Sequence, residues 1–189
     1  MSQSSRILMN WLVKEGITGK RVLDLGCGTG AFVIESLKNG ASSGSGIDLS
    51  REMIRKAKEL AADAGFQERA TFQLGNAALA ELAASDAVVL DKVICCYPEV
   101  GPLLKNAATA MPSLIGFVLP RDEGVWKWPL RIAAYIGNLI ERLRGKELSW
   151  FYLHSLPNVD RVLNEVGFAK RRKASSRIWL VFLYGREQH

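Results

Sequence analysis

The 189-residue chain contains few of the residues from which disulfide frameworks and metal centres are built. It has three cysteines and two histidines, and Cys95 and Cys96 are adjacent. A small, odd number of cysteines with two of them neighbours predicts no disulfide framework. No group of cysteine, histidine and acidic residues has the spacing of metal ligands, so we expect no metal. This residue usage is typical of a protein in a reducing cytoplasm.

Long apolar segments and targeting signals are also missing. No apolar run approaches the roughly 20 residues that a membrane span requires. The first residues lack a basic segment followed by an apolar one, so no secretory signal is expected. With 48% hydrophobic and 23% charged residues, the chain is not expected to be disordered or of low complexity. Its length fits a single domain, residues 1–189, with a core of its own.

The positive charge is confined to one part of the chain. The formal net charge is +6, and residues 1–120 hold 12 basic and 12 acidic side chains, against 13 and 7 in residues 121–189. A positive segment can attract an anionic substrate, a nucleic-acid backbone or an acidic membrane surface. The basic run at Lys170–Lys173 equally fits a solvated face.

Short β-type runs alternate with helical stretches, which predicts an α/β fold with a mainly parallel sheet. Strands are expected at residues 21–25, 43–48, 71–74, 87–90, 114–119, 170–174 and 178–184. Helices are expected at residues 5–15, 30–39, 50–64, 77–84, 99–110, 130–144 and 159–166. Ser50 and Asn158 are the expected N-caps of two of them. Residues 122–157 form a long insert, rich in Trp and Arg, which predicts a lid or substrate cover.

The most informative segment is the glycine loop that follows the first expected strand, Leu-Gly-Cys-Gly-Thr-Gly at residues 25–30. Gly26, Gly28 and Gly30 permit positive φ angles and let the backbone approach a ligand closely. The helix that follows presents unpaired N–H groups at its start. Alone, this pattern also fits a dinucleotide-binding loop or a tight turn without a ligand.

Two acidic residues make the pattern more specific. Asp24 precedes the first glycine by two positions, and Asp48 closes the next expected strand in Gly-Ile-Asp-Leu-Ser. The Asp48 carboxylate can accept hydrogen bonds from two ribose hydroxyls. The Asp24 carboxylate would repel a pyrophosphate but attract an ammonium group. The charges therefore favour a ligand with a positive end over NAD.

These motifs resemble those of the Rossmann-like class I S-adenosylmethionine-dependent methyltransferases. Residues 23–30 resemble the first motif of this family, and residues 46–50 resemble the second. The resemblance covers about residues 6–120. It implies a three-layer α/β sandwich with helices on both faces of a seven-stranded, mostly parallel sheet of order 3-2-1-4-5-7-6. It also implies S-adenosyl-L-methionine as cofactor and S-adenosyl-L-homocysteine as product.

The resemblance also implies roles for individual residues. The acid at Asp24 would serve the methionine end of the cofactor, and the acid at Asp48 would hold the ribose. Met53 resembles the apolar residue that packs on adenine, although it can equally be a core residue. Asn76 stands where the family usually has Asp; its carbonyl can accept from the adenine amine, and its NH₂ group can donate to a ring nitrogen. The expected cofactor contacts are Asp24, Gly26, Cys27, Gly28, Gly30, Asp48, Leu49, Met53, Asn76, Ala77, Asp91 and Lys92.

The reacting centre is expected at the end of the fourth strand, near Leu90–Lys92, because ligands bind outside the carboxyl ends of such sheets. The Asn/Asp-Pro-Pro-aromatic signature of nucleic-acid amino-methyltransferases does not occur here, so base methylation of that kind loses support. A general base is needed only when the acceptor enters protonated. His154 and Tyr97 are the candidate catalytic residues, with Lys92 and Glu99 as further candidates, and His154 can equally be a histidine held structurally by hydrogen bonds.

The insert contains an amphipathic helical segment, with apolar residues at positions 132, 136, 139, 140 and 143 and most basic residues elsewhere. It can be an ordinary packed helix, a lid over the acceptor, or, over residues 126–144, a contact with a membrane surface. Together these features favour methyl transfer to a small apolar or aromatic acceptor with an anionic group. The alternatives are an RNA methyltransferase that uses the basic last third, and a non-catalytic protein that binds the cofactor.

Overall fold

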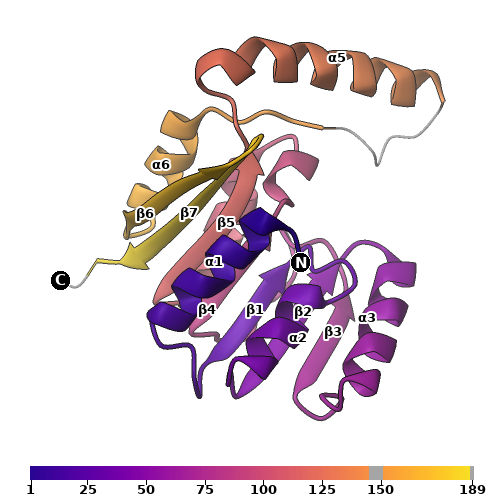
Figure 1. Ribbon diagram of the computed structural model, residues 1–189, viewed down its shortest axis with the longest axis vertical. Coiled ribbons are helices and arrows are strands. Elements are labelled where there is room, and N and C mark those ends of the chain that lie inside the picture. The colour runs from indigo at the N-terminus through magenta and orange to yellow at the C-terminus, as the bar shows by residue number, and fades with distance from the viewer. Residues whose placement is uncertain (145–150, 188–189) are drawn as a thin grey trace.

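The computed structural model describes residues 1–144 and 151–187 and contains one seven-stranded sheet of order β3-β2-β1-β4-β5-β7-β6 (Figure 1). The strands are β1 Arg21–Leu25, β2 Ser43–Asp48, β3 Ala70–Leu74, β4 Ala87–Asp91, β5 Leu114–Pro120, β6 Phe168–Ser176 and β7 Trp179–Arg186. The helices are α1 Gln3–Lys14, α2 Ala31–Lys38, α3 Arg51–Asp63, α4 Val100–Thr109, α5 Lys127–Leu143 and α6 Leu156–Glu165, with 3-10 turns η1 Ile94–Cys96 and η2 Gly124–Trp126. The predicted fold and strand order are confirmed.

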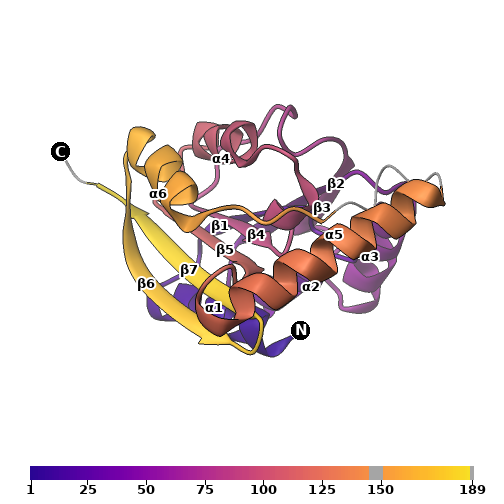
Figure 2. The same ribbon diagram turned by 90° about the horizontal axis from the view of Figure 1, so that it is seen from above.

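The first five strands run parallel, whereas β7 enters antiparallel between β5 and β6. All seven residues of β5 are buried, as expected of a strand covered on both faces. Helices α1, α2 and α3 cover one face of the sheet, and α4 and α6 cover the other (Figures 1 and 2). The sheet thus separates two apolar cores, which makes the three layers.

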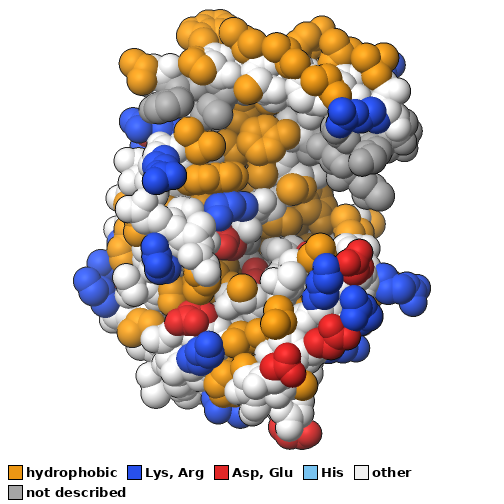
Figure 3. Space-filling model, turned by 45° about the vertical axis from the view of Figure 1, so that its right-hand side comes forward, with side chains coloured by type: hydrophobic (Ala, Val, Ile, Leu, Met, Phe, Trp, Pro, Cys, Tyr) orange, Lys and Arg blue, Asp and Glu red, His pale blue; other side chains and the backbone are white. Residues whose placement is uncertain are grey.

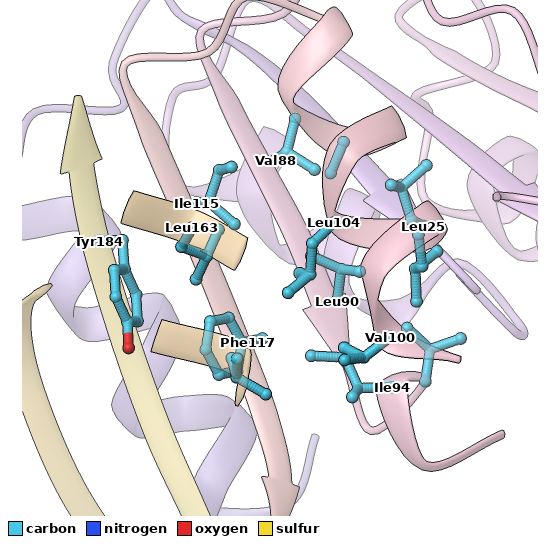
Figure 4. Packing of buried hydrophobic residues seen from close by; sticks show 14 of the residues in the cluster. Leu25, Val88, Leu90, Ile94, Val100, Leu104, Ile115, Phe117, Leu163 and Tyr184 are labelled. Atoms are coloured by element: carbon cyan, nitrogen blue, oxygen red, sulfur yellow. The ribbon is translucent and has the colours of Figure 1, made fainter. Parts of the chain in front are cut away.

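The core beneath α4 and α6 contains most of the large buried aromatic side chains. The ring centroids of Phe117 and Phe182, paired across β5 and β7, lie 5.3 Å apart, and the Tyr184 ring stacks on Phe117 at 5.5 Å. Leu104 from α4 and Leu163 from α6 belong to the same cluster, as Figure 4 shows. This packing holds β4 and β5 in place, and the candidate site lies next to the carboxyl end of β4.

Helix α5 stands apart from these layers, above the carboxyl ends of the parallel strands (Figure 1). It accounts for nearly half of the insert predicted as a lid, residues 122–157, of which residues 145–150 lie outside the described part of the chain. Within the described residues, no helix combines the length and the apolar character needed to cross a membrane.

The helix predicted at residues 77–84 is wrong, since this segment forms a turn followed by irregular chain. The cause is side-chain hydrogen bonding. Ala78 N–H donates to the Asn76 side chain (3.0 Å), and the Asn106 amide donates to the carbonyls of Ala77 (2.8 Å) and Ala80 (2.9 Å). Side-chain bonds of this kind offer the backbone an alternative to the helical pattern.

The N-cap of α3 was predicted correctly, and that of α6 was not. Met53 N–H donates to Ser50 Oγ at 3.3 Å, which caps α3. Helix α6 begins earlier than predicted, with Ser155 as N-cap and a proline in its first turn, where proline is well tolerated. Asn158 instead accepts from Arg161 at 2.7 Å, inside the helix.

We expect Ser50→Ala to lower the free energy of unfolding by about 1 kcal/mol, because it removes the side-chain oxygen that accepts from Met53 N–H at the start of α3. Ser155→Ala is the matched control, since Ser155 occupies the N-cap of α6 without a side-chain cap hydrogen bond. Urea denaturation of both variants measures the difference. Equal losses in the two variants would contradict the assigned cap.

Candidate active site

Three carboxylates gather where neighbouring strands end. Asp48 is the last residue of β2 and Asp91 the last of β4, while Asp24 lies near the end of β1, which runs between those two strands. Asp24 is only 2% exposed. Its Oδ1 atom is buried and has no hydrogen-bond partner in the described residues. A buried carboxylate without a partner is costly, so this arrangement indicates a site for a positive group.

Electrostatics at Asp24 agree with this reading. Burial, followed by the charges of Asp91 and then Asp48, raises the pKa of Asp24 well above its ordinary value. Each of these causes disfavours the ionised carboxyl group in the absence of a neighbouring cation. A positively charged ligand would reverse the effect and stabilise the carboxylate.

The glycine loop combines two structural requirements. Gly26, Gly28 and Gly30 have φ angles of 76°, 52° and 73°, in the left-handed region. A Cβ atom at Gly26 would lie 2.2 Å from a Val93 methyl carbon, and one at Gly30 would lie 2.7 Å from the Phe72 ring. A Cβ atom at Gly28 would meet nothing within 4 Å. Packing therefore requires the outer two glycines, whereas the middle one leaves open space beside the backbone.

Asp48 is held in place by this loop. Its Oδ2 atom accepts from Gly28 N–H at 2.8 Å, and its Oδ1 atom accepts from Ser50 N–H at 2.9 Å. Each carboxylate oxygen keeps a further lone pair for a ligand, because it can accept more than one hydrogen bond. The fixed carboxylate fits the role expected of it, accepting from a pair of hydroxyl groups.

A cavity of about 460 Å³ lies beside Asp48, within the range of small-molecule sites. Figure 3 shows a hollow on this side of the molecule, below α5. The cavity is lined by Gly26, Ile47, Asp48, Leu49, Gly75, Asn76, Ala77, Lys92, Val93, Cys96, Tyr97, Pro98 and Tyr152. Seven of these were expected at the site from the sequence: Gly26, Asp48, Leu49, Asn76, Ala77, Lys92 and Tyr97.

Other expected contacts lie next to the cavity rather than in its lining. Gly28, Gly30 and Asp24 belong to the loop and strand behind it, as described above. Cys27 is buried, and its side chain would contact a Cβ atom at Gly46. Met53 is half-buried in the first turn of α3. The roles proposed for these side chains toward the cofactor stay predictions.

Asn76 and Tyr97 form a pair in the cavity wall. The Tyr97 hydroxyl donates to Asn76 Oδ1 at 3.1 Å, and Ala78 N–H donates to the same oxygen at 3.0 Å. Two donors on one atom identify it as the amide oxygen. Burial is the main cause that raises the pKa of Tyr97, so its hydroxyl stays protonated. The Asn76 oxygen is thus already engaged by two protein groups, and the role of Asn76 toward adenine stays a prediction.

The end of β4 is contacted by the start of the chain. Ser5 Oγ donates to Asp91 Oδ2 at 2.5 Å, and Lys92 Nζ donates to Ser2 Oγ at 2.7 Å. The Lys92 ammonium also lies 5.2 Å from the centre of the Trp179 ring. The Lys92 side chain is thus directed toward the N-terminal segment and β7. Its backbone has a φ of 64°, and such strain in a non-glycine residue is common at functional sites.

His154 is bound to the turn that carries Tyr97. Its Nε2 atom lies 2.9 Å from the carbonyl oxygen of Tyr97 and 3.1 Å from that of Ile94. Because carbonyl oxygens only accept, Nε2 carries the proton and donates. Tyr152 N–H donates to the Cys95 carbonyl at 2.7 Å. The segment before α6 is therefore anchored to η1, which brings Tyr152 to the cavity; sequence reasoning missed Tyr152, although it lies two residues before His154.

In the described residues, no group of three or more histidine, cysteine or acidic side chains is arranged to hold a metal ion. The three strand-end carboxylates are thus not a metal centre in this geometry.

Comparison with known proteins gives the family. Residues 18–123, more than half of the chain, match the family model described as a methyltransferase domain. The chain belongs to this family. The predicted family is therefore confirmed. The residues of the site fit the expected cofactor, S-adenosylmethionine. The Asp24 oxygen without a partner can accept from a positively charged group, and Gly28 leaves space beside the loop.

Curated relatives match the methyltransferase chain over the same region. The ribosomal protein L11 methyltransferase of Yersinia pestis is 33% identical over 106 residues, which cover 56% of this chain and 36% of that protein. The same enzyme of Escherichia coli O1:K1 / APEC is 32% identical over 124 residues, 65% of this chain and 42% of that protein. The matches thus span less than half the length of these relatives.

Solved structures share the fold. Magnesium protoporphyrin IX methyltransferase from Synechocystis PCC 6803 with bound SAH has a TM-score of 0.77 at 20% identity, and the match covers 97% of this chain and 82% of that one. Geranyl diphosphate C-methyltransferase from Streptomyces coelicolor A3(2), in complex with Mg²⁺, geranyl diphosphate and S-adenosyl-L-homocysteine, has a TM-score of 0.75 at 14% identity, with coverages of 97% and 76%. At these identities the likeness concerns the fold alone.

We expect Asp24→Asn to stabilise the protein without its cofactor at pH 7. The raised folded-state pKa of Asp24 means that its carboxyl group destabilises the fold as pH rises above the unfolded-state pKa of about 3.9. The gain should therefore disappear below about pH 4. Thermal melts at several pH values measure it, because 1 kcal/mol corresponds to roughly 2–4 °C in a chain of this size.

Asp86→Asn is the control of opposite sign. Hydrogen bonds from the Arg21 side chain and backbone lower the pKa of Asp86, so its carboxylate stabilises the fold above the unfolded-state pKa and loses this effect as pH falls. Asp86→Asn should lower the melting temperature at pH 7. A loss of stability in both variants would show that Asp24 is not an uncompensated buried acid.

Proposed function

We propose that the chain transfers a methyl group from S-adenosylmethionine to a small-molecule acceptor that has an apolar or aromatic body and an anionic group. The observation that carries the proposal is the cavity of about 460 Å³, whose lining combines Asp48 and Asn76 with the aromatic side chain of Tyr152. Asp48 and Asn76 suit the cofactor. Tyr152 and the apolar lining residues Val93 and Pro98 offer walls suited to a small molecule.

When bound, S-adenosylmethionine supplies a methyl group on a positively charged sulfur. A lone pair of the acceptor forms the new bond to the methyl carbon as the carbon–sulfur bond breaks and its electrons return to sulfur. Positioning is the main task that remains for the protein. In this proposal Asp48 holds the ribose, Asp24 and Asp91 offset the positive charge of the methionine end, and the Asn76 NH₂ group donates to the adenine ring.

The acceptor would lie beyond the end of β4, between the aromatic walls and the end of β5. Arg121 follows β5 directly, and its Nε atom is buried without a hydrogen-bond partner in the described residues. A guanidinium group in this position is suited to a carboxylate. We therefore propose Arg121 as the group that meets the anionic part of the acceptor.

The alternative of an RNA acceptor has less support from the basic run Lys170–Lys173, because each of its side chains pairs with an acid. Lys170 pairs with Asp160 (2.7 Å), and Lys173 pairs with Glu123 (2.8 Å). Both arginines of the run contact Glu15, at 3.1 and 3.0 Å. The run also lies within β6, an edge strand of the sheet. Charged residues on an edge strand oppose pairing with other chains.

A labelled-methyl assay tests the proposed activity. The protein is incubated with S-adenosylmethionine carrying a labelled methyl group and with three separate pools: small aromatic carboxylates, ribosomal proteins and RNA. Label in the first pool, with release of S-adenosylhomocysteine, is the expected result. Label only in protein or RNA would overturn the small-molecule acceptor. Cofactor binding without turnover in any pool would favour the non-catalytic alternative.

We expect Asp48→Ala to weaken binding of S-adenosylmethionine about 10-fold or more, because a charge-assisted hydrogen bond contributes about 1.5–3 kcal/mol. Isothermal titration measures the dissociation constant. Asp63→Ala, which removes an exposed acid at the end of α3, is the control and should leave binding unchanged. A dissociation constant unaffected by Asp48→Ala would place the ribose elsewhere.

His154 is proposed as a positioning residue that holds Tyr97 through hydrogen bonds to the carbonyl oxygens of Ile94 and Tyr97. His154→Ala should lower turnover while the affinity for the cofactor stays within about 2-fold, since the contacted turn borders the acceptor side of the cavity. His154→Gln keeps an N–H donor and should restore part of the lost turnover. Failure of glutamine to restore any turnover, with both variants folded, would instead support the prediction that His154 acts as the general base.

A further inference from the structure

Helix α5 exposes a continuous apolar face to solvent. Trp128 is 67% exposed, Tyr135 72% and Leu143 80%. The α5 apolar face consists of Trp128, Ile132, Tyr135, Ile136, Leu139, Ile140 and Leu143, all of which are exposed. Spacings of three and four residues place these side chains on one side of the helix. Figure 3 shows hydrophobic side chains gathered along this edge of the molecule.

The protein body contacts a different side of α5. The Asn138 side chain donates to the Phe151 carbonyl at 2.8 Å and accepts from Phe151 N–H at 2.7 Å. Ala134, one turn earlier, is also half-buried. Asn138 thus anchors the helix while the α5 apolar face points aside from the body. The turn η2, which directly precedes α5 in the chain, contacts the start of the helix.

Basic residues are placed near both ends of this face. Residues 127–144 contain Lys127, Arg131, Arg142 and Arg144 against the single acid Glu141, a net charge of four minus one, or +3. Arg131 pairs with Asp122 at 2.7 Å. Lysine and arginine close to a surface of anionic lipids are attracted to it. Trp and Tyr on the apolar side suit the boundary between headgroups and acyl chains.

A second copy of the chain fits the α5 apolar face less well. A helix of 17 residues is about 26 Å long and offers a strip about 10 Å wide, or about 260 Å². A stable dimer buries about 800 Å² on each partner. Two facing helices would also bring like charges together. An anionic bilayer has neither restriction, because its surface is extended and its charge is opposite.

We propose that α5 lies in the surface of an anionic lipid bilayer, with its apolar face among the upper acyl chains and its basic residues at the headgroups. Helix α5 sits at the carboxyl ends of the parallel strands (Figures 1 and 2), and residues that line the cavity, such as Asp48 and Lys92, lie at the same end of the sheet. Docking through α5 therefore brings the cavity side of the protein toward the bilayer. This docking does not require methyl transfer, so it can be tested separately from the proposed reaction.

Flotation with lipid vesicles tests the proposal. The full chain is mixed with vesicles of phosphatidylcholine and phosphatidylglycerol, or of phosphatidylcholine alone, and bound protein is measured after centrifugation. We expect binding to the anionic vesicles that falls as salt is raised, and much weaker binding to the neutral ones. Leu139→Glu should reduce binding to the anionic vesicles roughly 10-fold, because it places a charge on the inserted face.

Leu60→Glu is the matched control. Leu60 on α3 and Leu139 on α5 are both helical leucines with 45% exposure, and the substitutions change the charge equally. Leu60→Glu should leave vesicle binding within about 2-fold. Equal losses in both variants, or no binding to anionic vesicles by the unmodified chain, would overturn the proposal. A dimer in sedimentation that Leu139→Glu disrupts, without vesicle binding, would show that a second copy covers the face instead.

Discussion

A carboxylate buried without a counter-charge is the constraint around which the site is arranged. Asp24 sits in the central part of the sheet, 2% exposed, and both neighbouring strands end in a further acid. Folding by itself gains nothing from such a group, because burial and the adjacent charges raise its pKa. The glycine loop and the cavity wall lie next to this uncompensated carboxyl group. A ligand with a cationic end would offset this charge and make the ionised carboxylate favourable.

Much of the fold was predictable because the central strands are short, apolar and separated by clear turns. Continuous apolar runs such as β4 and β5 are typical of strands covered on both faces. The glycine loop marks the end of β1. The segment at residues 77–84 was not predictable from periodicity. Its conformation depends on Asn106, a side chain from α4 that satisfies the carbonyls of Ala77 and Ala80.

The site itself was predictable only in part. Asp48 and Asn76 could be placed because Asp48 ends a strand and Asn76 follows one, at the edge of the sheet where ligands bind. The contact between Ser5 and Asp91 spans 86 residues of sequence, and no local pattern indicates it. The glycines look alike in the sequence, yet packing demands Gly26 and Gly30, whereas Gly28 leaves space. Such differences arise from neighbours brought together by the tertiary fold.

The pairing of Asn76 with Tyr97 has a consequence for the way the candidate site responds to acidity. An amide and a protonated phenol keep the same charge across the physiological range, and their hydrogen bond at 3.1 Å joins two neutral groups. The part of the pocket that would recognise the nucleobase is therefore indifferent to proton concentration.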